Sequence, residues 1–402
     1  MIKISKAGKL SALTLGLALM AGTAFAGPQM TFGPNDEGTL QLDYKGQFQM
    51  TVRDTGSGDN NDDNTAGFGF RRNRIALMGK YGDMLSLYAQ TEFTGDSNIG
   101  PLGVGSNSEP TAEFQMLDAV MRFNVNDALK INVGKFKYNL SRENLEACEM
   151  PLTLDRSLFI RTAMTTTRDQ GIAVWGNLFN DMFQYRADVM EGRKAVSGDV
   201  APSSSLRYSV RGHVTLLDPE NEYGYKGTYM GKKKVLTLGA AYQFEPEVAY
   251  GNNVAKTDKK DYTAWTVDAF FEYPLEGLGT ITASAAYEDV SLDDAYKSIN
   301  PDAATFGLNG QKNGYYMKAG YLLPGTPLQL FVRYERWQFA SLNDVFDQRI
   351  DWYGGGFNYY IRDQNLKLTF EASNTGFNKG TGTAVDGSKD FMTYITQLQL
   401  IF

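Results

Sequence analysis

The residues best suited to act on other molecules are charged side chains that recur at even spacings. Arg72 and Arg74 lie two residues apart, and Arg207 and Arg211 lie four apart. In an extended strand, residues at even separations project from the same face, so each pair would present two positive charges to the same surroundings. Fixed charges arranged in this way orient dipolar solutes and discriminate among ions.

Residue types that carry catalysis or bind metals are scarce. The chain has one cysteine, Cys148, and one histidine, His213. A single cysteine excludes a disulfide framework and a cysteine-based zinc site. A single histidine argues against histidine metal sites and against a serine–histidine hydrolase. The segment 59–64 has calcium-like residue types but lacks the glycine and the terminal glutamate of a calcium loop. We therefore predict no catalytic residue, no metal site and no cofactor.

The overall composition excludes two further classes of protein. The chain has 402 residues, with 39 Lys and Arg against 46 Asp and Glu, for a net charge of −7. An acidic chain without a basic cluster is a poor candidate for binding nucleic acid. Beyond the first 26 residues, no stretch approaches the roughly 20 apolar residues of a membrane-spanning helix, which argues against a helical membrane protein.

The first 26 residues have the pattern of an export signal. Lys3, Lys6 and Lys9 precede an apolar stretch over 10–22, and Ala24-Phe25-Ala26 follows as a cleavage site. This order is typical of a secretory signal peptide. We therefore predict cleavage after residue 26, with residues 27–402 forming a single exported domain.

Period-two alternation of apolar and polar residues predicts strands along the rest of the chain. Between 365 and 374, for example, Leu366, Leu368 and Phe370 alternate with Lys367, Thr369 and Glu371. Most such segments are about as long as the 9–11 residues that a tilted strand needs to cross a bilayer. We predict sixteen strands, at 39–53, 68–79, 84–94, 113–124, 129–137, 170–178, 182–190, 206–216, 234–244, 262–273, 279–289, 314–322, 328–339, 350–361, 365–374 and 390–402.

The connectors alternate between short turns and long polar loops. This layout, with an apolar and a polar face on each strand, is typical of an outer-membrane barrel. A soluble sandwich or propeller is less compatible, since the chain lacks the sequence repeat of propeller blades. The predicted fold is all-β: a transmembrane antiparallel β-barrel of about 16 strands. One connector does not fit, because 217–233 should be a short turn, so either that turn is elaborated or the strand register changes there.

Several motifs resemble those of a known family. The chain ends in Phe402, with Tyr394, Leu398 and Leu400 on the same face of the last strand, and this resembles the assembly signal of outer-membrane porins. The stretch 131–161 and the arginine-rich segment 70–80 resemble the phosphate-selective porin O/P family. Members of that family are sixteen-stranded, usually trimeric barrels whose third long loop folds into the lumen. The resemblance therefore implies that 138–169 forms an infolded constriction loop.

The polar face of each strand is expected to line the lumen, because unpaired charge facing lipid is costly. Basic residues gather on the early strands and acidic ones at 262–273 and 279–289, which predicts a basic wall opposite an acidic wall. The alternative is that these charges pair between neighbouring strands. The candidate pore-lining and constriction residues are Arg72, Arg74, Arg122, Arg142, Arg156, Arg161, Arg207, Arg211, Glu92, Asp118, Asp268 and Glu272.

The sequence therefore predicts a porin, a water-filled outer-membrane channel for passive diffusion of small hydrophilic solutes and ions. An anion- or phosphate-selective channel is one alternative: Arg72, Arg74 and Arg156 match arginines of the family, but no lysine cluster is found on the lumen face. A barrel sheathing a partner protein in a conduit is another, and an infolded loop would oppose it. The expected partners are outer-membrane lipid and lipopolysaccharide, small solutes and ions, and two further copies in a homotrimer, with no nucleic acid.

Overall fold

The computed structural model describes residues 27–59, 62–93, 114–157, 167–193, 200–342, 344–379 and 390–402. The predicted signal peptide at 1–26 and the candidate residue Arg161 lie outside these ranges. Among the described residues, no helix is long and apolar enough to cross a membrane.

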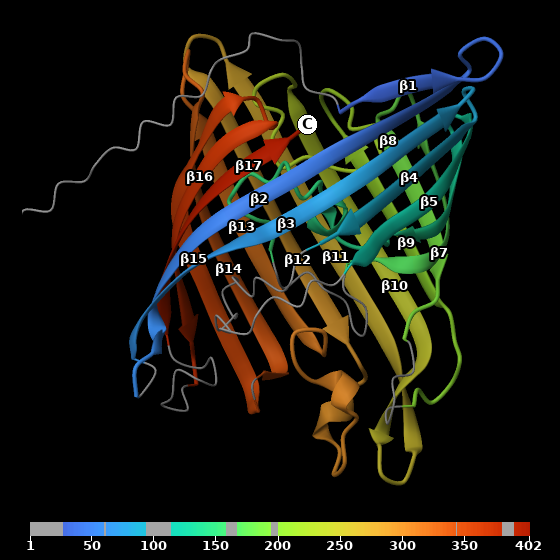
Figure 1. Cartoon of the computed structure of the whole chain (residues 1–402). Coiled ribbons are helices and arrows are strands. Elements are labelled where there is room, and N and C mark those ends of the chain that lie inside the picture. Colours follow the sequence, from blue (N-terminus) through green and yellow to red (C-terminus); the bar gives the residue numbers. More distant parts are fainter. Residues whose placement is uncertain are drawn as a thin grey trace, which may run out of the picture.

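The described residues form an antiparallel barrel of sixteen strands, β2 to β17, which confirms the predicted fold class (Figure 1). Each strand pairs with the next along the chain, and β17 pairs with β2 to close the barrel. A short strand, β1 (Gln29–Phe32), pairs with the start of β2. The barrel strands are β2 (Gly38–Ser57), β3 (Asp63–Tyr81), β4 (Leu85–Glu92), β5 (Gln115–Asn126), β6 (Leu129–Phe136), β7 (Asp169–Leu178), β8 (Phe183–Met190), β9 (Arg207–Thr215), β10 (Val235–Asn252), β11 (Thr257–Leu275), β12 (Gly279–Ser291), β13 (Lys312–Leu322), β14 (Leu328–Leu342), β15 (Val345–Arg362), β16 (Leu366–Phe377) and β17 (Phe391–Ile401).

The barrel has its polar residues inside and its apolar residues outside. On β17, Leu398 and Leu400 are exposed on the outer surface, whereas Gln397 and Gln399 are buried. Gln399 accepts a hydrogen bond of 2.6 Å from the side chain of Gln47 on β2, and Gln397 accepts one of 2.7 Å from Gln49. The closing seam is therefore held by side-chain amide pairs in addition to the backbone ladder. This arrangement suits a barrel whose outer face meets lipid and whose inner face meets water.

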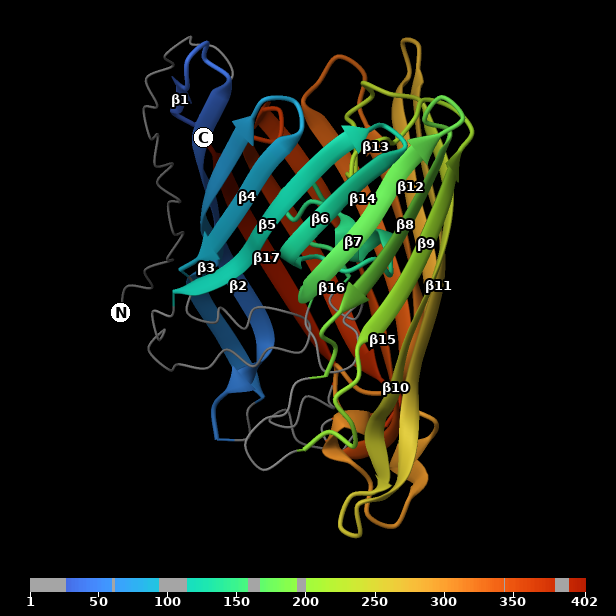
Figure 2. The same ribbon diagram turned by 90° about the vertical axis from the view of Figure 1, so that its right-hand side faces the viewer.

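The two ends of the barrel differ (Figure 2). Short turns and the C-terminus lie at one end, called here the turn end, and the described parts of the other long connectors, such as 292–311, lie at the opposite end. The exception is the connector between β9 and β10, residues 216–234. It starts at the turn end and folds back into the barrel, where it contacts the segment that follows β6. The strand register stays regular around it, so the misfit in the sequence reflects an elaborated turn.

The connector between β6 and β7 also enters the barrel, as predicted for 138–169. Its stretch 137–157 is called the inner loop. Nearly every side chain of 138–157 is buried, including charged ones. One turn of helix, α1 (Arg142–Leu145), begins after Ser141, whose hydroxyl accepts a hydrogen bond from the backbone N–H of Asn144. The cap satisfies a helix-end donor that would otherwise be buried without a partner.

Candidate functional site

The inner loop is fastened to the wall formed by β13 to β17. Lys318 forms an ion pair with Glu143, and the hydroxyl of Ser157 donates a 2.5 Å hydrogen bond to Glu335. Along the same wall, the side chain of Asn358 donates to the carbonyl of Leu152 (2.9 Å). Further contacts to the loop come from Gln47, Lys367, Glu371 and Gln399. The loop therefore occupies the half of the interior next to these strands.

Asp155 ties the inner loop to the arginine-rich strand β3. Its carboxylate lies 2.8 Å from Arg72 Nη2 and 2.7 Å from Arg71 Nη2. Burial alone would raise the pKa of Asp155, but the two guanidinium groups hold it well below its usual range. Arg156 turns inward and donates to the carbonyls of Glu143 (2.8 Å) and Asn144 (3.0 Å). Two of the arginines that match the family motif are thus engaged in holding the loop.

The connector 216–234 meets the inner loop from the turn end. The N–H of Ala147 donates to the carbonyl of Tyr225 (2.9 Å), and the N–H of Gly227 donates to that of Met150 (2.9 Å). Arg142 forms two hydrogen bonds of 2.7 Å each with the carboxylate of Glu220. Burial would raise the pKa of Glu220, but Arg142 lowers it to about 2. The two segments therefore form one joined structure inside the barrel.

The connector is in turn held by the barrel wall. Glu272 on β11 accepts hydrogen bonds from the N–H groups of Tyr229 (2.9 Å) and Gly231 (2.8 Å). Tyr225 is buried, and its hydroxyl lies 2.7 Å from His213 Nδ1 and 3.2 Å from Arg211 Nε. The lone histidine thus has a structural contact within the lumen.

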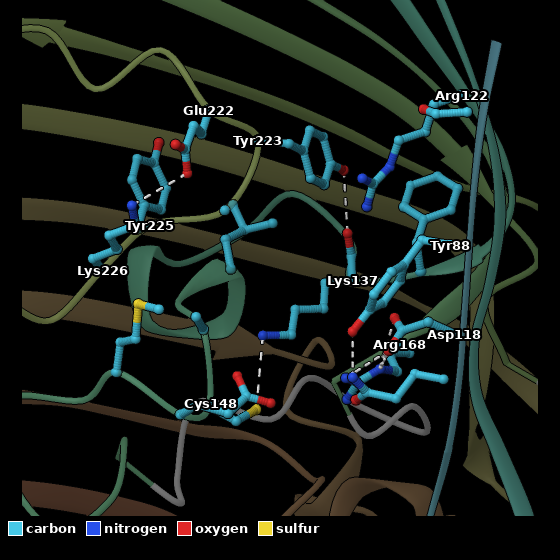
Figure 3. Close-up of a pocket in the computed structure, with 18 of the residues that line it drawn as sticks. Tyr88, Asp118, Arg122, Lys137, Cys148, Arg168, Glu222, Tyr223, Tyr225 and Lys226 are labelled. Carbon is cyan, nitrogen blue, oxygen red and sulfur yellow. Dashed lines mark hydrogen bonds and ion pairs between the residues drawn. The ribbon is translucent and has the colours of Figure 1, made fainter. Parts of the chain in front are cut away.

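A cavity of about 690 Å³ remains between these two segments and the wall of β2 to β7 (Figure 3). It extends from Lys130 and Trp175, near the turn end, to Arg74 and Asp118, near the middle of the barrel. The inner loop and the connector close its other side. It is lined by Lys45, Arg74, Ser86, Tyr88, Gln90, Asp118, Arg122, Asn124, Lys130, Phe136, Lys137, Leu145, Ala147, Cys148, Glu149, Met150, Arg168, Trp175, Asn221, Glu222, Tyr223, Gly224, Tyr225 and Lys226.

Basic residues outnumber acidic ones in the cavity lining. Some are paired: Arg168 lies 2.9 Å from Asp118, Lys45 lies 3.5 Å from Glu149, and Arg74 pairs with Glu92. By contrast, neither Arg122 nor Lys137 forms an ion pair with any carboxylate in the described ranges. The basic lining residues are Lys45, Arg74, Arg122, Lys130, Lys137, Arg168 and Lys226, and the acidic ones are Asp118, Glu149 and Glu222. The cavity therefore carries an excess of positive charge.

Lys137, which lies beside Cys148, makes part of this charge sensitive to pH. The Nζ of Lys137 donates to the carbonyl of Glu146 (2.5 Å) and lies 3.8 Å from the sulfur of Cys148. Burial lowers the pKa of Lys137 to about 7, despite the opposing effect of Cys148. Burial would raise the pKa of the Cys148 thiol, but nearby cations, Arg156 and Lys137 foremost, lower it well below its usual value.

The residues predicted to line the pore fall into three groups. Arg74, Arg122 and Asp118 line the cavity, with Glu92 paired to Arg74. Arg72, Arg142 and Arg156 hold the inner loop and the connector. Arg207 and Arg211 pair with Glu245 (2.7 Å) and Asp268 (2.6 Å), and Glu272 binds the connector backbone.

The predicted separation of a basic and an acidic wall is wrong for β9 and β11. Only β10 lies between these two strands, so Arg211 reaches Asp268 and the charges neutralise each other. Charges thus pair between nearby strands instead of forming opposite walls. The sequence reasoning also missed the share of the connector in the cavity, including Tyr223 and Lys226. The feature of the sequence that could have indicated this contribution is the unusual length of the turn at 217–233.

Comparison with known proteins places the barrel in a family. The family model described as "Phosphate-selective porin O and P" matches residues 42–402, almost all of the barrel. The chain belongs to this family. It is therefore an outer-membrane porin with a β-barrel fold, as the resemblance of the motifs at 70–80 and 131–161 implied.

Individual relatives are distant from this porin. An uncharacterised protein of Aquifex aeolicus (strain VF5) is 27% identical over 265 residues, which are 60% of this chain and 58% of that protein. The match thus spans less than two thirds of that relative.

Solved structures share the fold. The anion-selective porin from Comamonas acidovorans has a TM-score of 0.56 and 13% identity, with 91% of this chain and 100% of that chain covered. The channel DcaP of Acinetobacter baumannii has a TM-score of 0.54 and 14% identity, with 94% and 100% covered. OmpF of Salmonella typhi has a TM-score of 0.58 and 12% identity, with 93% and 100% covered.

Proposed function

We propose that this porin passes small hydrophilic solutes with a moderate preference for anions, along the cavity beside β2 to β7. The observation that carries the proposal is the excess of cations in the cavity lining, with Arg122 lacking a carboxylate partner in the described ranges. A wall with low-dielectric surroundings and one sign of excess charge concentrates ions of the opposite sign. Since Arg168, Lys45 and Arg74 are paired, the preference is moderate rather than absolute.

A strict phosphate specificity fits the arrangement less well. Such a site would need several basic groups free to surround one anion. Arg72 is held by Asp155, and Arg156 is held by carbonyls of the inner loop. The family description is therefore a guide to the fold and to the channel, and the geometry supports a broader range of anions.

The same interior opposes a role as a sheath around a partner protein. The inner loop and the connector lie within the lumen and are bonded to each other there, which opposes the passage of a second polypeptide. We assign no catalytic step and no cofactor to the cavity residues.

We also propose that the chain assembles as a homotrimer surrounded by outer-membrane lipid and lipopolysaccharide. One of the similar structures, OmpT of Vibrio cholerae, is described as a trimer form. The exposed leucines and aromatic residues of the outer face supply apolar surface for both kinds of contact. Chemical cross-linking in outer-membrane vesicles tests this proposal: bands up to a trimer support it, and monomer alone contradicts it.

Replacement of Arg122 by glutamine tests the charge preference. It removes a cavity charge that no carboxylate of the described ranges neutralises, so we expect the reversal potential in a salt gradient to shift toward less anion preference. Arg336→Gln is the matched control, because Arg336 lies on β14 with 43% side-chain exposure and does not line the cavity. Equal reversal potentials for Arg122→Gln and the unmodified protein would contradict the proposal.

A further inference from the structure

Aromatic rings and weakly neutralised cations meet at the turn end of the cavity. Tyr88, Arg122, Lys130, Trp175 and Tyr223, called here the ring–cation site, come from β4, β5, β6, β7 and the connector. Strand pairing fixes the places of three of them. Lys130 is opposite Trp175 across β6 and β7, and Arg122 is opposite Asn132, two residues further along β6. Arg122 and Lys130 are therefore diagonal neighbours on the inner wall.

Each cation of the site lies beside a ring. The guanidinium of Arg122 is 5.5 Å from the centre of the Tyr88 ring, and the Nζ of Lys130 is 4.7 Å from that of Trp175. The ring of Tyr223 extends this surface, since it meets Trp175 edge-on at 5.3 Å with an interplanar angle of 61°. Figure 3 shows Arg122 between Tyr88 and Tyr223 at the edge of the cavity.

The charges of the site are available to a ligand. Arg122 has no carboxylate partner in the described part of the chain, and its buried Nε has no hydrogen-bond partner there. Lys130 is 3.6 Å from Asp127, but that carboxylate is 90% exposed, so water screens the pair. An anion that enters the cavity thus finds two cations whose charge the protein compensates weakly.

The combination of rings and cations favours anions that also carry a flat apolar group. An inorganic anion would use the cations and leave the rings without a partner, whereas a flat organic anion can use both. A carboxylate accepts hydrogen bonds from a guanidinium and an ammonium group, and an aromatic ring packs edge-on or offset against other rings. The cavity of about 690 Å³ lies within the usual size range of small-molecule sites.

We propose that the ring–cation site is a transient binding site for small aromatic carboxylates. The carboxylate lies between Arg122 and Lys130, and the ring packs against Trp175 and Tyr223. The proposal rests on the anion preference argued above and names a class of solute for the same cavity. Binding in a channel must be weak enough to allow release, so the site raises flux at low solute concentration and saturates at high concentration.

Competition with chloride current tests the site. The refolded full chain is placed in a planar bilayer in potassium chloride, and benzoate, acetate or phosphate is titrated into the bath. Burial of the ring should make the concentration of benzoate that halves the chloride current about tenfold lower than that of acetate or phosphate.

Two variants of Tyr223 separate the ring from the rest of the residue. The Tyr223 hydroxyl donates a 3.2 Å hydrogen bond to the carbonyl of Lys137, so Tyr223→Phe removes that bond and keeps the ring. We expect Tyr223→Phe to retain the tenfold difference between benzoate and acetate. Tyr223→Leu should lose most of it, and a chloride current through this variant shows that the channel has assembled.

The outcomes distinguish this inference from the function on which it rests. Anion preference in a salt gradient, together with equal half-blocking concentrations for benzoate and acetate, would overturn the aromatic site alone. A stronger effect of phosphate than of benzoate would likewise overturn it. Absence of anion preference in the same gradient would contradict the proposed function itself.

Discussion

Replacing Glu220 by glutamine should release the inner loop from the connector that holds it. The Arg142 and Glu220 side chains are 0% and 2% exposed and share two hydrogen bonds of 2.7 Å. The Arg142 guanidinium also lies 4.0 Å from the centre of the Phe270 ring, so little water can replace the lost carboxylate. Breaking one partner of a buried pair costs about 3–5 kcal/mol, and we expect about 3 kcal/mol because glutamine keeps one acceptor.

This energy should appear as motion of the loop rather than as loss of the barrel. The backbone pairing of the strands does not involve Glu220, whose side chain bonds Arg142 of the inner loop, Tyr229 of the connector and the side chain of Thr237 on β10. A change of ~3 kcal/mol shifts an equilibrium constant on the order of a hundredfold. We therefore expect single-channel recordings of Glu220→Gln to show frequent steps to a larger conductance, which are rare in the unmodified porin.

Two further variants make the interpretation specific. Glu222→Gln, in the same connector, removes a carboxylate that is 69% exposed and 3.6 Å from Lys226. This variant should show the larger conductance steps as rarely as the unmodified porin. The double variant Arg142→Met with Glu220→Leu leaves neither member of the pair as an unpaired buried charge. It should show fewer of the larger conductance steps than Glu220→Gln alone. A current of normal conductance without frequent larger steps in Glu220→Gln would refute the idea that the connector holds the inner loop in place.

The pH dependence of the unmodified protein follows from the same pair. Because the pKa of Glu220 is lowered to about 2, its stabilising effect is fully present above about pH 4.5 and is lost as pH falls through 2. The larger steps should thus appear in the unmodified porin only in strong acid.

Two other predictions concern the charge of the cavity. Because the pKa of Lys137 is lowered to about 7, Lys137 gains charge as pH falls, and the anion preference should rise between pH 8 and pH 6. Lys137→Met should flatten this rise in reversal-potential measurements. An unchanged slope would contradict the conclusion that Lys137 causes the pH dependence. Cys148 lines the cavity among cations that favour its thiolate, so an anionic methanethiosulfonate should reduce the conductance faster than a cationic one of similar size. Cys148→Ser is the control. Faster reaction with the cationic reagent would contradict a net positive charge in the cavity.

The barrel itself could be predicted from local pattern. Alternation on β16, where Leu368 and Phe370 face outward and Lys367 and Thr369 face inward, requires no knowledge of distant residues. The predicted segments correspond to β2 to β17, but some boundaries were too short. For β10 the alternation of apolar residues ends near 244, whereas the strand continues to Asn252. There the paired strand β11 carries exposed Lys259, so the apolar pattern no longer marks the hairpin.

The candidate site was harder to predict, because its contacts join distant parts of the chain. Periodicity placed Arg72 on the inner face, but it could not show that Asp155, from the inner loop, would occupy its guanidinium. The same holds for Arg142 and Glu220, which belong to two connectors. The aromatic lining from Tyr223 was missed because only the folded connector brings it against the wall of β4 to β7. The local sequence indicates whether a residue lies on the inner or the outer face of its strand. The ion-pair partner of an inner residue depends on how the loops fold into the lumen.

The most direct test of the central claim is the reversal potential of single channels of the unmodified porin in a potassium chloride gradient. A channel whose pathway follows the cation-rich cavity should give a potential of the sign that chloride sets, smaller than the value of about 59 mV per tenfold gradient for ideal selectivity. A potential near zero, or one of the sign that potassium sets, would contradict the proposal that ions pass along this cavity.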